Sequence, residues 1–151
     1  MSIAERVDQD LVTAMRARDE TRLATLRLLK AAAKNAEVSK RSPLTDEEYV
    51  AVVRRQVKMR REAASEYDRG NRPQQAAQER DEGVILEAYL PAQLDESTLR
   101  QLVNRAIEET GASSPSELGK VMSHAMRAAN GRADGNQVNQ LARALLSERA
   151  G

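Results

Sequence analysis

The chain of 151 residues has no cysteine, no tryptophan, no phenylalanine and a single histidine, His124. The absence of cysteine excludes disulfides, thiolate metal ligands and cysteine nucleophiles. One histidine cannot by itself build a histidine-based metal site, so we expect neither a metal nor another cofactor. Three tyrosines are the only aromatic residues, which disfavours a stacking platform for single-stranded RNA.

Long apolar runs are also missing. No stretch approaches the roughly 18 apolar residues that indicate a membrane-spanning helix, and the N-terminal MSIAERVDQD has no apolar segment of the signal-peptide type. We therefore expect a cytoplasmic protein with no membrane partner. The net charge of +1 does not indicate a nucleic-acid-binding protein, so any electrostatic binding surface must come from local arrangement.

What the chain does have is apolar residues at helical spacing, in a background of strong helix formers. This pattern predicts an all-α protein. We place a domain boundary at Pro91, with an N-terminal helical domain over 1–91 and a C-terminal three-helix bundle over 92–151. The first domain is expected to hold helices over 3–18, from 19 to about 38, from 46 to about 70, and from 73 to 89.

Several residues predict how the helices of the first domain end and pack. Thr45 and Glu48 form a capping-box pattern, and Gly70 is expected to end its helix in a left-handed conformation. Gly83 costs about 1 kcal/mol relative to alanine inside a helix, which indicates a close helix contact or a bend. Residues expected to face inward include Ile3, Val7, Leu11, Ala14 and Met15 in the first helix, and Ala77, Val84, Ile85, Ala88 and Tyr89 in the fourth.

The second domain has clearer helix boundaries. Asp95 is expected to begin its first helix and Gly111 to end it. Ser114 to Glu117 combines a capping box with a proline at the first helical position. Gly119 is interpreted as a site of close helix packing. Inward positions at helical spacing are Leu99, Leu102, Val103, Ala106, Ile107, Leu118, Val121, Met122, Ala125, Met126, Val138, Leu141, Ala142, Leu145 and Leu146.

Basic residues are concentrated in RRQVKMRR, where five of eight side chains are cationic. Arg54, Lys58 and Arg61 fall on one helical stripe, which could follow a phosphate backbone. The alternative is a solvated face on which Lys58 pairs with Glu62. The same two interpretations apply to a second basic face, which consists of Arg27, Lys30 and Lys34.

Two further features, His124 and the NGRADGNQV segment, bear on function. His124 lies near an apolar stripe with no carboxylate at helical spacing to orient it, so we interpret it as a partly buried structural residue. In NGRADGNQV, Gly131 is expected to end one helix, and Asp134 with Gln137 to begin the next. Two roles are open for Arg132: a contact with RNA, or an ion pair with a nearby carboxylate. No phosphate-binding glycine loop and no nucleophile–base pair is visible.

Five segments, in the same order and at matching spacing, resemble the GatB/YqeY family, and its stand-alone YqeY-like members in particular. They are TLRLLKAAAKNAEV (25–38), LTDEEYVAVVRRQVKMRREA (44–63), ILEAYLPAQL (85–94), ELGKVMSHAM (117–126) and GRADGNQVNQLARALL (131–146). The resemblance covers nearly the whole chain. It implies an N-terminal helical domain followed by a three-helix domain.

The resemblance also implies a function. A similar module forms the tail of the B subunit of the tRNA-dependent amidotransferase, where it engages tRNA while the kinase and transamidase chemistry belongs to other parts. By this likeness we expect a non-catalytic module that binds tRNA and assists amidation, with an amidotransferase or another protein as partner. The candidate phosphate contacts are Lys120, Arg127 and Arg132, with Arg54, Lys58 and Arg61 as a second patch.

The chain departs from the family pattern at two places. Ser123 stands where many relatives have a glycine, and the segment 127–130 replaces a Lys or Pro-Lys before GRADG, which reduces the positive charge beside that turn. Two alternative functions stay open. One is a protein–protein adaptor that uses the small-residue helix faces around 31–36. The other is a non-autonomous subunit of a carbon–nitrogen ligase with glutamine as amido donor.

Overall fold

The computed structural model describes residues 1–151 and contains seven α-helices, one short 3₁₀ helix and no strand. The all-α prediction is confirmed. The chain divides into two compact units, Met1–Leu90 (unit 1) and Pro91–Gly151 (unit 2). None of the helices combines the length and apolar character that a membrane crossing requires.

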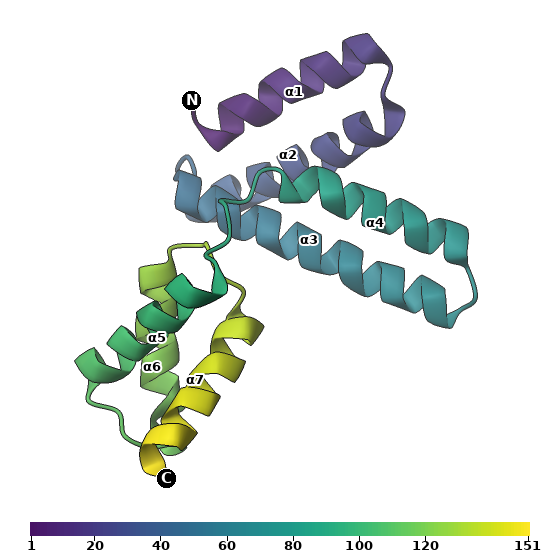
Figure 1. Cartoon of the computed structure of the whole chain (residues 1–151). Helices are drawn as coiled ribbons and strands as arrows, with labels where there is room; N and C mark the ends of the chain where they lie inside the picture. Colours follow the sequence, from purple (N-terminus) through teal and green to yellow (C-terminus); the bar gives the residue numbers. More distant parts are fainter. The chain divides into compact units, whose positions relative to one another are not determined.

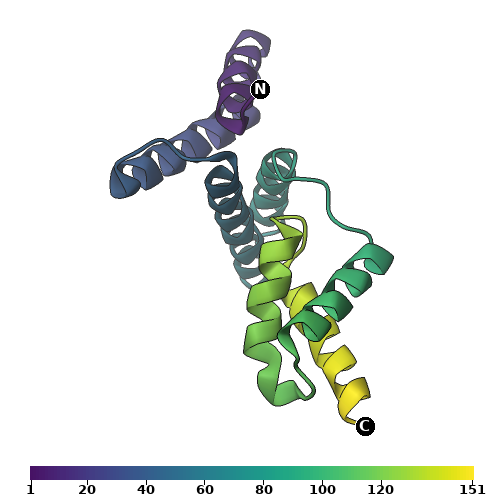
Figure 2. The same ribbon diagram turned by 90° about the vertical axis from the view of Figure 1, so that its left-hand side faces the viewer.

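Unit 1 consists of two helical hairpins (Figure 1). Its helices are α1 (Ile3–Ala17), α2 (Glu20–Lys40), α3 (Asp46–Arg69) and α4 (Pro73–Glu87). α3 and α4 run side by side over most of their length, as Figure 2 also shows. α2 contacts each of the other three helices and so joins the two hairpins.

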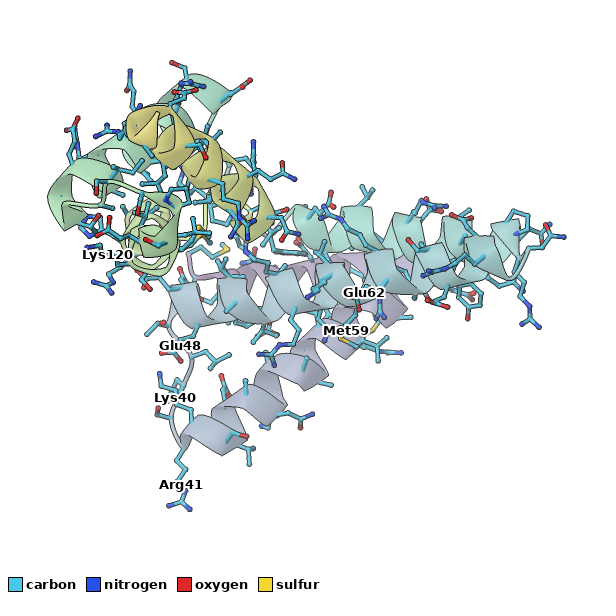
Figure 3. All side chains as sticks on the ribbon, turned by 90° about the horizontal axis from the view of Figure 1, so that it is seen from below. Lys40, Arg41, Glu48, Met59, Glu62 and Lys120 are labelled. Atoms are coloured by element: carbon cyan, nitrogen blue, oxygen red, sulfur yellow. The ribbon has the colours of Figure 1, made fainter.

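The N-termini of α2 and α3 show how the local sequence starts a helix. The Asp19 carboxylate accepts a hydrogen bond from the Arg22 N–H at 3.1 Å, and the Thr45 hydroxyl accepts one from the Glu48 N–H at 3.1 Å. These side chains satisfy N–H groups that the first turn of a helix leaves unpaired. The Glu48 carboxylate accepts a hydrogen bond from Lys40 Nζ at 2.7 Å, which ties the end of α2 to the start of α3 (Figure 3).

The end of α3 differs from the expectation. Gly70 follows the helix with φ −83°, and the left-handed residue is Asn71, with φ 59°. Asparagine tolerates this conformation better than most residues. The turn is closed because the Arg72 N–H donates to the Tyr67 carbonyl at 2.8 Å, and Pro73 then begins α4 as predicted.

The core of unit 1 contains residues from all four helices, including the predicted Val7, Ile85 and Tyr89, but four positions expected to face inward do not. Met15 and Val84 are exposed rather than buried, and Ala77 and Ala88 are exposed as well. The buried residues of α4 are Ala76, Gly83, Ile85 and Leu86, and Glu79 and Glu82 lie beside Arg60 of α3. Gly83 is buried and faces α3, but a Cβ added to it would lie at an ordinary contact distance of 3.8 Å from Arg60 Cβ, so the contact does not require glycine.

Unit 2 consists of α5 (Glu96–Thr110), the 3₁₀ helix η1 (Pro115–Glu117), α6 (Leu118–Ala129) and α7 (Gly135–Ala150). Its three α-helices pack pairwise on one another. The predicted inward residues are all buried or partly buried there. Asp95, Gly111 and the Ser114–Glu117 capping box have the predicted roles.

Two details of unit 2 differ from the expectation. Gly119 is exposed, and a Cβ added to it would meet no atom within 4 Å, so it marks no close helix contact. The Asp134 carboxylate caps α7 by accepting from the Asn136 N–H at 3.0 Å, where we had expected Gln137 to complete the cap. An Asp side chain reaches the second N–H of a helix as readily as the third.

Candidate nucleic-acid interface

The cationic stripe predicted on α3 is partly engaged in ion pairs. Arg61 Nη2 lies 2.8 Å from Glu87 Oε1 of α4, although the Arg61 side chain is 66% exposed. Lys58 forms only a long, exposed pair with Glu62, at 3.9 Å. Arg54 is half-buried. The stripe therefore lies on one helix as expected, but Arg61 also links α3 to α4.

Arg60, which the sequence analysis did not single out, is the least exposed cation of this segment that pairs with a carboxylate. Its side chain is 14% exposed, and its Nε lies 3.3 Å from Glu82 Oε2 and 3.8 Å from Glu79 Oε2. Burial and the neighbouring Glu82 raise the pKa of Glu79. Residue spacing in the sequence could have indicated this low exposure, because Arg60 lies on the same helical stripe as the buried residues Val57 and Ala64. We interpret this cluster as structural.

Lys120 lies at the start of α6 and at the outside of unit 2 (Figure 3). Its Nζ is 2.9 Å from Glu117 Oε1, and the side chain is 48% exposed. The other carboxylate oxygen of Glu117 accepts hydrogen bonds from the N–H groups of Ser113 and Ser114. These contacts, led by the one from Ser113, lower the pKa of Glu117 to about 2.

His124 has a carboxylate partner that the sequence analysis missed. Its Nε2 lies 2.5 Å from Glu109 Oε2. Helical spacing within α6 could not reveal this contact, because Glu109 comes from α5, fifteen residues earlier. The pair becomes an ion pair when the ring is protonated. Its hydrogen bond joins two helices, and no hydroxyl nucleophile is bonded to the ring.

The contact between Glu109 and His124 places cations of α5 and α6 on one surface. Lys120, His124 and Arg127 follow one another at spacings of four and three, so they share one side of α6. Arg105 precedes Glu109 by four residues and shares its side of α5. Arg105 and Arg127 are exposed, and neither forms a hydrogen bond or an ion pair. We call the surface formed by Arg105, Glu109, Lys120, His124 and Arg127 the α5–α6 face.

Arg132 has a backbone partner. Its Nε donates to the Ala92 carbonyl at 3.0 Å, and the Leu94 N–H donates to the Arg132 carbonyl at 2.8 Å. The carboxylate partner considered from the sequence is therefore not found. Arg132 instead fastens the segment that precedes α5 to the turn between α6 and α7.

Comparison with known proteins identifies the family. The family model described as Yqey-like protein matches residues 4–146, so the chain belongs to that family and the resemblance to its stand-alone members is confirmed. Among curated proteins, the comparison found no match.

Proposed function

We propose that this member of the Yqey-like protein family is a cytoplasmic, non-catalytic helical module that binds tRNA through the α5–α6 face. The observation that carries the proposal is the exposed pair Arg105 and Arg127, which lack protein partners and flank Lys120 and His124. The resemblance to the tRNA-engaging tail of the amidotransferase B subunit supports tRNA as the ligand and an accessory role in amidation.

The chemistry of the face suits a phosphate backbone. Arginine presents a planar fork of N–H donors that matches phosphate oxygens, and each neutralised phosphate releases counterions. The face carries no aromatic side chain on which a base could stack. A folded RNA recognised by its shape and backbone therefore fits better than an unstructured single strand.

We rank the six cations named from the sequence by their position and their protein partners. Lys120 and Arg127 belong to the α5–α6 face, and Arg105 joins them. Arg127 and Arg105 have no protein partner, whereas Lys120, Arg61 and Arg132 each have one that a phosphate would have to displace. Arg54 and Lys58 remain a proposed secondary patch on α3.

The test compares two triple variants with the same loss of charge. Arg105→Gln/Lys120→Gln/Arg127→Gln removes the cations of the α5–α6 face. Its control removes three other arginines that are exposed and make no ion pair. The control is Arg16→Gln/Arg72→Gln/Arg143→Gln.

Binding of bulk tRNA is measured by filter retention at low salt, with circular dichroism to confirm that each variant is folded. We expect the first variant to lose affinity by on the order of tenfold to a hundredfold, because three phosphate contacts disappear. We expect the control to lose less than about threefold, through the change in net charge alone. An equal loss in both variants, or no tRNA binding by the wild type, would refute the proposal.

A further inference from the structure

The helix α2 has a second apolar face on the side opposite the core. Its buried side chains, among them Leu26, Leu29 and Ala33, pack inside unit 1. The opposite face is exposed, with Leu28 54% and Val38 68% accessible. We define the outer stripe of α2 as Ala24, Leu28, Ala31, Asn35 and Val38, all of them exposed.

The spacing of the outer stripe is that of a helix-pairing surface. Its residues alternate at intervals of four and three, which is the heptad pattern by which one helix packs along another. Apolar side chains occupy four of the five positions, and Asn35 lies among them. A single polar residue at such a position fixes the register of a helix pair at some cost in stability. The pattern therefore indicates a helical partner laid along α2.

A row of cations borders this stripe. Arg27, Lys34 and Arg41 follow one another at intervals of seven residues, each beside the outer stripe or just past its end. All three are exposed, and Arg41 projects away from the helices (Figure 3). None of them forms an ion pair, whereas Lys30, on the side toward α1, is 2.7 Å from Asp8. One acid, Glu20 in the first turn of α2, lies seven residues before Arg27 and so on the same side of the helix.

From this juxtaposition we propose that the outer stripe of α2 docks an amphipathic helix of a partner protein that is acidic on the flank facing Arg27, Lys34 and Arg41. Charges beside a heptad seam select the partner, because opposite charges attract across it and like charges repel. This surface lies in unit 1 and is separate from the α5–α6 face, so the inference goes beyond tRNA binding and does not depend on it.

A second copy of the chain complements the surface less well. In a parallel pair, the cationic row would face the opposite flank of α2, where Ala32 and Ser39 are accessible and no acid lies. In an antiparallel pair centred on the helix, Arg27 would meet Lys34 of the other copy. Neither arrangement places acids opposite the middle of the row.

The test uses two synthetic helical peptides of about four heptads. Both have leucine at the seam positions and one central asparagine; the first has glutamate on both flanks and the second has lysine. Like charges on each peptide oppose its self-association at pH 7. Binding to the full chain is measured by isothermal titration calorimetry, and amide shifts in a labelled sample locate the site.

We expect the glutamate peptide to bind and the lysine peptide not to bind. Arg27→Glu/Lys34→Glu should reverse this preference. Leu28→Ser should weaken binding by about tenfold, because one leucine side chain is no longer buried in the complex. The matched control is Val84→Ser on α4, which also alters an exposed apolar residue (65% accessible) and should leave binding unchanged.

Several results would overturn the inference. One is equal binding of the two peptides, and another is peptide binding that Leu28→Ser does not weaken. A dimer in sedimentation that Leu28→Ser dissociates would assign the stripe to a second copy. Binding to phosphatidylglycerol vesicles that is lost in Leu28→Ser would assign it to a lipid surface. Loss of tRNA affinity in Leu28→Ser would assign it to RNA, whereas unchanged tRNA affinity separates this inference from the proposed function.

Discussion

Both units have an apolar core, but they differ in the polar contacts that join their helices. In unit 1, Arg60 of α3 lies between Glu79 and Glu82 of α4, and its side chain is only 14% exposed. The Tyr89 hydroxyl is also hydrogen-bonded to Asp10 of α1. In unit 2 the pairs between helices, Arg100–Glu148, Arg149–Glu108 and His124–Glu109, consist of side chains that are at least 37% exposed. Little-exposed ion pairs between helices thus occur in unit 1 alone.

This difference bears on which cations are available to a ligand. In unit 1 many of the cations that lie near carboxylates hold one helix to another, as Lys30, Lys40 and Arg61 do. In unit 2 Arg100 and Arg149 likewise pair between α5 and α7, whereas Arg105 and Arg127, on the α5–α6 face, form no ion pair. An RNA phosphate can bind such side chains without breaking an internal contact.

The largest loss of stability is expected on substitution of Arg60 in unit 1. Arg60→Ala leaves Glu79 and Glu82 facing each other in a poorly hydrated contact, and we expect it to lower the free energy of unfolding by roughly 2–3 kcal/mol. Arg61→Ala also removes an ion pair, but at an exposed position, so it should lower the free energy of unfolding by less than about 1 kcal/mol. Urea unfolding followed by circular dichroism measures both. Equal losses in the two variants would show that the Arg60 cluster does not support unit 1.

The two units should respond to opposite extremes of pH. In unit 1, burial, with smaller contributions from Asp8 and Glu37, raises the pKa of Tyr49 to about 12. A raised pKa means that the neutral phenol favours the folded state, so this contribution is complete below pH 10 and is lost as the pH rises toward 12. We expect unit 1 to lose up to about 2 kcal/mol there. Hydrogen exchange in α3 measures it, with Tyr49→Phe as the variant that lacks the alkaline loss.

In unit 2 the sign is reversed. The pKa of Glu117 is lowered from 4.5 to about 2, so its carboxylate favours the folded state above pH 4.5. That contribution disappears as the pH falls toward 2. The protection of amides at the start of α6 against hydrogen exchange, taken relative to the intrinsic exchange rate at each pH, should therefore fall in acid, and Glu117→Gln should remove that response. An acid response that Glu117→Gln leaves intact would argue against this carboxylate as the source.

The smallest expected effects come from two helix ends that use the same backbone conformation. In unit 1 α1 ends at Arg18 with φ 55°, and in unit 2 α5 ends at Gly111 with φ 70°. Arg18→Gly should stabilise the protein by up to about 1 kcal/mol, and Gly111→Ala should destabilise it by about 1 kcal/mol. Thermal unfolding of both variants measures these opposite shifts. Shifts of the same sign would mean that side-chain contacts outweigh backbone strain.

How far the sequence predicts the structure also differs between the units. In unit 2 the helices begin and end at capping residues and glycine, and their apolar faces are continuous, so the inward residues were predicted correctly. In unit 1, apolar periodicity correctly placed Ile85 and Tyr89 inside but wrongly placed Val84 there. The true contact of α4 with α3 includes Glu79, Glu82 and Gly83, and no rule of apolar spacing assigns such residues to an interior.

The candidate site shows a similar limit. Lys120 and Arg127 could be placed on one side of α6 by their spacing. Arg105 could not be joined to them, because its place depends on the Glu109–His124 contact between two helices. Arg132 lies in the turn where it was expected, yet its bond to the Ala92 carbonyl involves backbone forty residues away. Residue spacing along one helix cannot predict such contacts between residues of different helices.

The salt dependence of tRNA binding tests the central claim most directly. The logarithm of the binding constant is measured against the logarithm of the salt concentration for the wild type, Arg127→Gln and the control Arg143→Gln. We predict a steep negative slope for the wild type, and a slope smaller in magnitude by roughly one for Arg127→Gln. Arg143→Gln should keep the wild-type slope. Identical slopes for all three proteins would contradict the assignment of the α5–α6 face as the tRNA-binding surface.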